Sequence, residues 1–365
     1  NEVLESAGFD EFVEGLSARF YHARLGRPSL QPGIYFRALL IGYFEGIEGE
    51  RGIAWRVADS LGLRRFLRIG LDEGTPDHST ISRTRRLMDI DTHRAVLAGG
   101  CRGQAPVAAQ RGGGFILEAA TWRASADWGQ MLGYTPAALA EANCMAIAQL
   151  VDLRSRLEEG KLDIVVSGCL GPRGDGYNGT IRMSAQQAQD YHAAQVETFA
   201  DTAADMVNAM TITYPDEAIG IVRAADQAEL PVAISFTVET DGALPDGTEL
   251  GAAVEWVDDA TGGSAAYFGI NCAHPTHFAH VLDPTAPWTR RLRSLRANAS
   301  RRTNTELDES DSLDAADAFE LGAQYAELRA TLPGLTVLGG CCGTDVSHLR
   351  VIAGTLAAQQ GRPSG

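Results

Sequence analysis

Three cysteines stand out in the sequence because their thiolates could share one metal ion. Cys341 and Cys342 are adjacent and lie between glycines, and Cys272 precedes them by about seventy residues. Soft sulfur ligands suit zinc, and three protein ligands with a fourth position left open are typical of a catalytic zinc site rather than a structural one. The alternative interpretation is that Cys341 and Cys342 are ordinary small buried residues.

Adjacent cysteines can bind the same ion only in a particular backbone setting. Neighbouring residues inside a straight strand face opposite sides of the sheet, so Cys341 and Cys342 must lie where a strand ends and the chain turns. Glycines on both sides of the pair permit such a turn. The sequence therefore predicts a strand that ends at the cysteine pair.

The elements that would position these thiols are seven apolar runs separated by helical stretches. The runs cover residues 115–119, 164–168, 206–211, 232–237, 266–272, 294–299 and 335–342. Alternating strands and helices predict a parallel sheet with right-handed crossovers. Seven strands approach the count of a (β/α)8 barrel, in which the active site forms at the carboxyl ends of the strands.

Polar loops follow several of these runs, as the barrel interpretation requires. They lie at residues 121–125, 171–177, 239–242 and 274–277, and the seventh run ends in the cysteine pair. A single loop of this kind is more often a plain turn. Their shared position favours one functional site on the rim that the carboxyl ends of the strands form.

Residues 1–98 have a different texture and are predicted to be helical throughout. Helical spacing of apolar residues covers 9–21, 33–47 and 52–67, and a fourth helix, 81–87, follows the capping residues at 77–80. Its Arg83, Arg85 and Arg86 could neutralise DNA phosphates in a helix-turn-helix-like module. The alternative is that these arginines only form a solvated face.

Composition bounds the remaining possibilities. The chain has 365 residues, 45% of them hydrophobic, and a formal charge of -16. Residues 1–100 hold 13 basic and 14 acidic side chains, which leaves 18 against 33 in the remainder, so the acidic part is a poor partner for nucleic acid. Six cysteines, with no signal peptide and no apolar run of membrane length, predict a reduced, cytoplasmic protein without membrane contact.

The predicted domain organisation follows from these changes of texture. A helical domain covers residues 1–98, and a junction of Gly, Ala, Gln and Arg without periodicity covers 99–113. An α/β barrel-like domain covers 114–358.

Residues 1–98 closely resemble the N-terminal domain of insertion-sequence transposases. The segments that carry this resemblance are 26–37, 42–47, 50–56 and 75–82. Transposases of this kind cut DNA with an acidic triad on a later RNase-H-like domain, and no such domain follows in this sequence. The resemblance therefore implies a DNA-binding or dimerising part without its own chemistry.

The remainder, from about residue 113 to residue 354, resembles the homocysteine S-methyltransferase family. The segments that carry this resemblance are 121–125, 167–172, 271–272, 297–299 and 339–344. Members are zinc-dependent barrel enzymes that move a methyl group onto a thiol. The resemblance implies that Cys272, Cys341 and Cys342 are the zinc ligands and that the sulfur of homocysteine is the fourth. It also implies substrate contacts by three further residues, Trp122, Glu217 and Asn298.

Two departures from the family pattern concern the fold and the substrate. Family members begin with a strand that carries an Asp-Gly-Gly motif, and here transposase-like sequence takes the place of that strand and its helix. Met210-Thr211 also stands where the family commonly has Glu-Thr, which removes one anchor for the substrate amino group. We therefore expect a (β/α)8 barrel that lacks its first strand–helix unit, with unpaired edges on two strands.

The sequence supports one leading interpretation of function and leaves two others open. The leading one is a zinc-dependent domain that transfers a methyl group from a small-molecule donor to a thiol such as homocysteine, with loss of activity through truncation as its other outcome. The second is a DNA-binding transposase remnant, with weak DNA contact by residues 1–98, that carries a non-catalytic methyltransferase fragment. The third is that the fusion is not a real gene product.

Overall fold

The structure is a computed structural model in which the chain forms two compact units, Asn1–Arg102 and Gly103–Gly365. Each unit is described here by itself. The residues that the structure describes are 4, 8–21, 30–44, 47, 49–89, 92–93, 96, 105, 107–109, 113–157, 162–174, 176, 182–303, 306 and 316–360.

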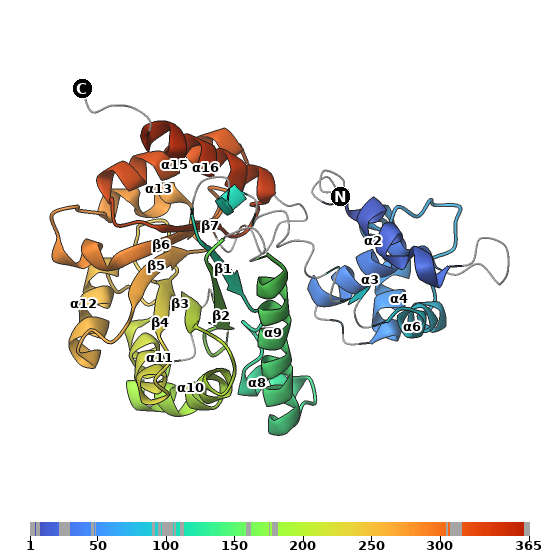
Figure 1. Ribbon diagram of the computed structural model, residues 1–365, viewed down its shortest axis with the longest axis horizontal. Coiled ribbons are helices and arrows are strands. Elements are labelled where there is room, and N and C mark those ends of the chain that lie inside the picture. The colour runs from blue at the N-terminus through green and yellow to red at the C-terminus, as the bar shows by residue number, and fades with distance from the viewer. Residues whose placement is uncertain are drawn as a thin grey trace. The chain divides into compact units, whose positions relative to one another are not determined.

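The second unit is built on one sheet of seven parallel strands in sequential order (Figure 1). Every neighbouring pair is parallel. The strands are β1 (Phe115–Glu118), β2 (Ile164–Leu170), β3 (Met206–Ile212), β4 (Val232–Phe236), β5 (Tyr267–Asn271), β6 (Leu292–Ala297) and β7 (Val337–Gly340).

Helices connect successive strands and cover the outer face of the sheet (Figure 1). They are α8 (Ala126–Met131), α9 (Pro136–Leu157), α10 (Ala185–Ala200), α11 (Pro215–Gln227), α12 (Leu250–Thr261), α13 (Pro275–Phe278), α15 (Ala318–Thr331) and α16 (Val346–Gln360), with short 3-10 turns η3 (Ala279–Val281) and η4 (Pro287–Arg291). One hydrophobic core joins strands β2 to β6 to most of these helices.

The sheet is an incomplete TIM barrel, as the sequence predicted. Within the described part of the chain, β1 and β7 each pair with a single neighbour, so the curved sheet has two edges. All residues of β3 and β4 are buried, whereas the four residues of β7 are only partly buried. The half-open side therefore lies at β1 and β7, where a complete barrel would have its first strand.

The seven predicted strands correspond one to one with the observed strands. The largest differences in bounds are two residues at each end, in the sixth strand, predicted at 294–299 and observed at Leu292–Ala297, and in the last, predicted at 335–342 and observed at Val337–Gly340. Both cysteines of the pair thus follow the strand, which is the turn position that a shared ion requires.

The first unit is helical, as predicted, but one of its helices is divided. The elements are α2 (Phe9–Ser17), η1 (Ala18–Phe20), α3 (Pro32–Phe44), α4 (Glu50–Ala58), α5 (Leu61–Phe66) and α6 (His78–Leu87). The prediction of a single helix over 52–67 is wrong, because Ser60 adopts an extended conformation and its side chain caps α5 by accepting a hydrogen bond from Leu63 N. The predicted cap of the last helix is Asp77, which accepts from Thr80 N at 2.8 Å.

A buried arginine organises the core of this first unit. Arg37 is 1% exposed, and its guanidinium donates to both carboxylate oxygens of Asp10, at 2.8 and 2.9 Å, and to the carbonyl oxygen of Phe66. The guanidinium also lies over the rings of Phe9 and Phe66. Hydrogen bonding from Arg37 holds the pKa of Asp10 below its usual value. These contacts join α2, α3 and α5.

Two sequence predictions, the junction at 99–113 and the absence of a membrane span, can be compared only with the described residues. The predicted junction at 99–113 lies mostly outside them, since only 105, 107–109 and 113 are described there. Among the described residues, no helix has the length and apolarity that a membrane span needs.

Replacing Arg37 tests this organisation. We expect Arg37→Met to destabilise the first unit by about 2 kcal/mol, because it removes the bidentate partner of the Asp10 carboxylate and leaves that carboxylate with its ion pair to Arg68. Hydrogen–deuterium exchange of the α3 amides, followed by mass spectrometry, measures the loss locally. The exposed Arg83→Met is the control, and equal exchange in both variants would contradict the role of Arg37.

Candidate metal centre

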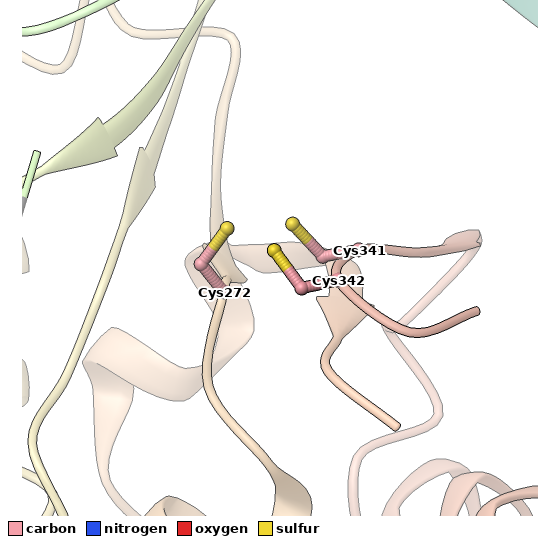
Figure 2. Close-up of side chains that lie close together, drawn as sticks. All are labelled: Cys272, Cys341 and Cys342. Carbon is pink, nitrogen blue, oxygen red and sulfur yellow. The ribbon is translucent and has the colours of Figure 1, made fainter. Parts of the chain in front are cut away.

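The three predicted cysteines converge at the carboxyl ends of β5 and β7. Their sulfur atoms all lie within 4.8 Å of one another, and among the described residues they form the group of side chains that could hold a metal ion. Figure 2 shows the three side chains directed to the same side, Cys272 from one segment and Cys341 and Cys342 from another. Sequence reasoning therefore predicted this convergence correctly, across about seventy residues of chain.

The spacing and chemistry of the thiols fit a metal such as zinc. Sulfur ligands at about 2.3 Å in a tetrahedral arrangement are separated by about 3.8 Å, so small side-chain adjustments would suffice. The neighbouring thiols of Cys272 and Cys342, together with burial, raise the pKa of the Cys341 thiol well above its usual value. Three thiols this close can all lose their protons only if a cation balances them.

Exposure differs among the three thiols in a way that leaves one side open. Cys272 is buried, Cys341 is half-buried and Cys342 is exposed. A fourth ligand could therefore approach from the side of Cys342, which is the open position that catalytic metal sites keep.

Cys272 is positioned by the strand ends around it. It directly follows β5, its N–H donates to the carbonyl oxygen of Arg296 on β6 at 3.2 Å, and its carbonyl oxygen accepts from Thr237 Oγ1 at 3.4 Å. Its φ of 54° lies in the left-handed region that non-glycine residues rarely occupy.

The turn that carries Cys341 and Cys342 is held mainly by β6 and by its own residues. Cys341 N–H donates to the carbonyl oxygen of Ala297, which extends the β6–β7 ladder by one residue. The Thr344 hydroxyl and N–H both donate to the Cys341 carbonyl oxygen, at 2.7 and 3.1 Å. A Cβ at Gly340 would lie 2.1 Å from Thr344 Oγ1, so only glycine fits there.

Asn298, predicted to contact the substrate, supports this turn. Its Oδ1 accepts from the Cys342 N–H at 3.1 Å, and its own N–H donates to the carbonyl oxygen of Ala273. Asn298 thus links the segment after Cys272 to Cys342. Its contact with a substrate stays a prediction.

The other two predicted substrate residues lie at different places. Trp122 is half-buried, and its Nε1–H donates to the carbonyl oxygen of Met210, so the ring spans from the end of β1 to the end of β3. Glu217 is fully buried on α11, and its Oε1 accepts from Arg173 N–H and pairs with His192 Nε2 on α10. Their contacts with a substrate also stay predictions.

The interior beneath the cysteines holds an ion pair that sequence reasoning missed. Arg296 of β6 pairs with Glu118 of β1, and Asn208 of β3 donates to the other oxygen of Glu118 at 2.9 Å. Glu118 also raises the pKa of Arg296. The sequence signal was available, because residue 296 lies two positions before Asn298 in the strand predicted at 294–299, and residues two apart in a strand share a face.

A cavity of about 280 Å³ opens beside the cysteine cluster. It is lined by His274, Ala299, Arg301, Arg302, Ala316, Asp317, Glu320 and Leu321. Ala299 N–H donates to the Cys342 carbonyl oxygen, so the wall of the cavity is continuous with the cysteine turn. Burial, with His277 and Arg301 nearby, lowers the pKa of His274 to about 4, which leaves its imidazole neutral at pH 7.

Comparison with known proteins gives this arrangement a family. Residues 108–356, more than half of the chain, match the family model described as Homocysteine S-methyltransferase. The chain belongs to this family. Residues 2–87 match a second model, described as Transposase domain (DUF772), so a transposase domain precedes the homocysteine S-methyltransferase domain.

Curated relatives of the homocysteine S-methyltransferase domain are much longer proteins. Methionine synthase of Mycobacterium leprae (strain TN) is 31% identical over 147 residues, and methionine synthase of Mycobacterium tuberculosis (strain ATCC 25618 / H37Rv) is 32% identical over 143 residues. Each match covers 38% of this chain and 11% of the relative. The chain thus spans about a tenth of these relatives.

Solved structures support the fold assignment. The metallated form of the homocysteine methyltransferase MmuM from Escherichia coli superposes with a TM-score of 0.56 at 16% identity, covering 86% of this chain and 99% of that one. Its oxidized form gives a TM-score of 0.56 at 18% identity, covering 81% and 93%. At this identity the likeness shows the shared fold.

The helix α16 begins directly after the cysteine turn, and Asp345 caps its first turn. Asp345 Oδ1 accepts from the N–H groups of Ser347 and His348 at the start of α16. Partial burial raises the pKa of Asp345, but hydrogen bonds from Ser347 and His348 outweigh it and lower the pKa to about 2.

We expect Asp345→Ala to lower the free energy of unfolding by about 1 kcal/mol at pH 7, because the cap of α16 is lost. A carboxylate with a lowered pKa stabilises the folded state above its unfolded pKa of about 4 and loses this effect as the pH falls toward 2. The difference between variant and wild type in urea unfolding should therefore shrink from pH 6 to pH 3. The exposed Asp259→Ala is the control, and a constant difference for Asp345→Ala would count against the charged cap.

Proposed function

We propose that the homocysteine S-methyltransferase domain binds zinc through Cys272, Cys341 and Cys342 and transfers a methyl group to a thiol such as homocysteine. The observation that carries this proposal is the convergence of the three sulfur atoms within 4.8 Å at the carboxyl ends of the strands. Family membership supports the same chemistry.

The reaction is a transfer between two sulfur atoms when the donor is a sulfonium compound. Zinc held by three thiolates would supply the positive charge that keeps an acceptor thiol deprotonated near neutral pH. The acceptor thiolate attacks the methyl carbon of the donor, and the new sulfur–carbon bond forms as the old one breaks. The electron pair of the broken bond stays on the donor sulfur, which becomes a neutral thioether.

The protein's own residues support this reaction by holding the acceptor side open. Cys342 is exposed, and the cavity beside it contains the cationic Arg301 and Arg302 and the anionic Asp317 and Glu320. Such a mixed lining suits a zwitterionic amino acid better than an apolar ligand. We propose that Asn298 and Trp122 contribute to the same rim, and that Glu217 contributes through its contact with the Arg173 backbone.

Cysteine replacement tests the proposal. We expect Cys272→Ala, Cys341→Ala and Cys342→Ala each to lose zinc and to reduce methyl transfer from S-methylmethionine to homocysteine at least 100-fold, because each removes one of three ligands. Zinc content of the purified full chain and the rate of methionine formation are the two measurements. Cys144→Ala, a free cysteine on α9 outside the cluster, is the matched control.

The measurements separate two kinds of failure. A folded wild-type chain that contains no zinc and takes up none contradicts the metal site. A chain that binds zinc stoichiometrically but forms no methionine contradicts the proposed transfer while leaving the metal site in place.

A second function is proposed for the first unit, on the match of residues 2–87 to a transposase domain. Arg83, Arg85 and Arg86 are all exposed on α6. Arg85 pairs with Glu50 on α4 at 3.1 Å, which partly neutralises it, whereas Arg83 and Arg86 are three residues apart and share a face. We propose that this face makes weak contact with DNA phosphates.

Salt dependence tests this contact. We expect the full chain to bind a labelled DNA duplex at low salt and to lose affinity steeply between about 50 and 200 mM salt, because bound arginines release counterions. The double variant Arg83→Ala/Arg86→Ala should lower the slope of log K against log salt by about 2. Fluorescence anisotropy gives both values, with Arg154→Ala in the second unit as the control. Unchanged binding by the double variant, or no binding at low salt, would remove the proposal.

A further inference from the structure

Two strand ends near the thiol cluster hold non-glycine residues in the left-handed conformation. Thr211, at the end of β3, has φ 63°, and Cys272, directly after β5, has φ 54°. Such a conformation is unfavourable for a residue with a Cβ, and more so for a β-branched one such as threonine. It persists where surrounding contacts over-determine it, and such places are common at functional sites.

A single buried side chain joins these two residues. Asn271 immediately precedes Cys272, is the last residue of β5 and has 0% exposure. Its Oδ1 accepts from Thr211 N–H at 2.8 Å, and its Nδ2 donates to Thr211 Oγ1 at 2.9 Å. The amide therefore uses both its acceptor and its donor on one residue, across the intervening strand β4.

The backbone of β3 is arranged for this contact. The pairing of β3 with β4 shifts register between Ala209 and Ile212, so the Thr211 N–H is free of the ladder and available to Asn271. A left-handed Thr211 thus serves the contact with Asn271, and Asn271 in turn fixes the residue that follows it.

Cys272 is held on its other sides by two further strand ends. Arg296 on β6 accepts its N–H, and Thr237 after β4 donates to its carbonyl oxygen. With Asn271 anchored on β3, the peptide groups before and after Cys272 are both fixed. The left-handed φ then sets the direction of the Cα–Cβ bond, and from there the sulfur lies toward Cys341 and Cys342.

We propose that Asn271 is a positioning residue of the thiol site, which uses its two hydrogen bonds to Thr211 to keep Cys272 in the left-handed conformation that directs its sulfur at the other two thiols. The inference rests on the proposed function in assuming that the three cysteines bind a metal ion. The observed geometry of the three sulfurs does not depend on methyl transfer. A purely structural role would be to satisfy the Thr211 N–H in a buried place. The two roles differ in their effect on metal binding.

Cobalt(II) titration of the full chain distinguishes these roles. Thiolate-to-cobalt charge-transfer absorption reports how many sulfurs bind, and competition with a chelator reports the affinity. We expect Asn271→Ala to bind cobalt(II) 10–100-fold more weakly, as is typical when a partner that orients a metal ligand is removed. The absorption should fall toward that of two thiolates, because Cys341 and Cys342 remain in place.

A matched control removes another buried asparagine. Asn143 on α9 is 2% exposed, donates to the carbonyl oxygens of Ala124 and Leu139 and accepts from Gln195. Asn143→Ala should lose stability in urea without changing cobalt(II) affinity or spectrum. Thr211→Val, which replaces the Oγ1 hydroxyl with a methyl group and leaves the Thr211 N–H contact in place, should shift affinity in the same direction as Asn271→Ala by a smaller factor. It carries the test if Asn271→Ala does not fold.

The outcomes are separable from those of the proposed function. Wild-type affinity and spectrum in Asn271→Ala, or equal losses in Asn271→Ala and Asn143→Ala, would overturn the inference. If the wild-type chain binds no cobalt(II), the proposed metal site fails, and the inference is judged on the thiols alone. Alkylation by iodoacetamide, mapped by mass spectrometry, should then be several-fold faster at Cys272 relative to Cys341 in Asn271→Ala, and an unchanged ratio would overturn it.

Discussion

The hydrogen-bonded ladder that runs from β5 through β6 to β7 is the interaction on which the thiol site depends. Cys272 and Cys341 both donate their N–H groups to β6, at Arg296 and Ala297. These two acceptors are adjacent on one strand, so the distance between the two cysteine-bearing segments is fixed by the width of a single strand. The spacing of the two cysteine-bearing segments therefore depends on β5, β6 and β7, and β3 and β4 add the contacts that hold Cys272.

The open edge of the incomplete barrel lies at β7, the last strand of this ladder. β7 is a short edge strand, and other groups supplement its single row of backbone hydrogen bonds. The Tyr325 hydroxyl on α15 donates to Gly339 O on β7 and accepts from Ala297 N–H on β6, at 2.7 and 2.8 Å. Asn298 adds its contact with Cys342 N–H. Contacts from α15 and β6 thus support a strand that has one neighbour within the described part of the chain.

The interior of the incomplete barrel contains an ion pair that is partly exposed to water. The Glu118 and Arg296 side chains are 14% and 31% exposed although they project between strands. An ion pair in contact with water carries a smaller desolvation cost than one in a sealed core, so this pair is compatible with an open side. The same openness explains why β7 is only partly buried while β3 and β4 are fully buried.

Much of this architecture could be predicted from the sequence, because the information is local. Apolar runs located all seven strands, and a cysteine pair between glycines located the turn after β7. The helix prediction over 52–67 failed because serine can lie inside a helix or cap the start of one. Tertiary packing determines which of the two Ser60 does, and here it caps α5. Hydrogen bonds and ion pairs between residues far apart in the sequence could not be predicted either, because they too depend on packing. Nothing near Asn271 indicates that Thr211 is its partner, and nothing near Glu118 indicates Arg296, since strand curvature and register create both contacts.

The division of the three thiols between an inner strand and an edge strand has a thermodynamic consequence. Cys272 follows a strand with neighbours on both sides, whereas Cys341 and Cys342 follow one that, among the described residues, pairs on one side. Edge elements can open locally at a free energy well below that of global unfolding. Any ion that binds all three sulfurs must therefore bind the closed edge preferentially, and its binding free energy adds to the local stability of β7. Metal occupancy and closure of the last strand are then thermodynamically linked, so a change in one shifts the other.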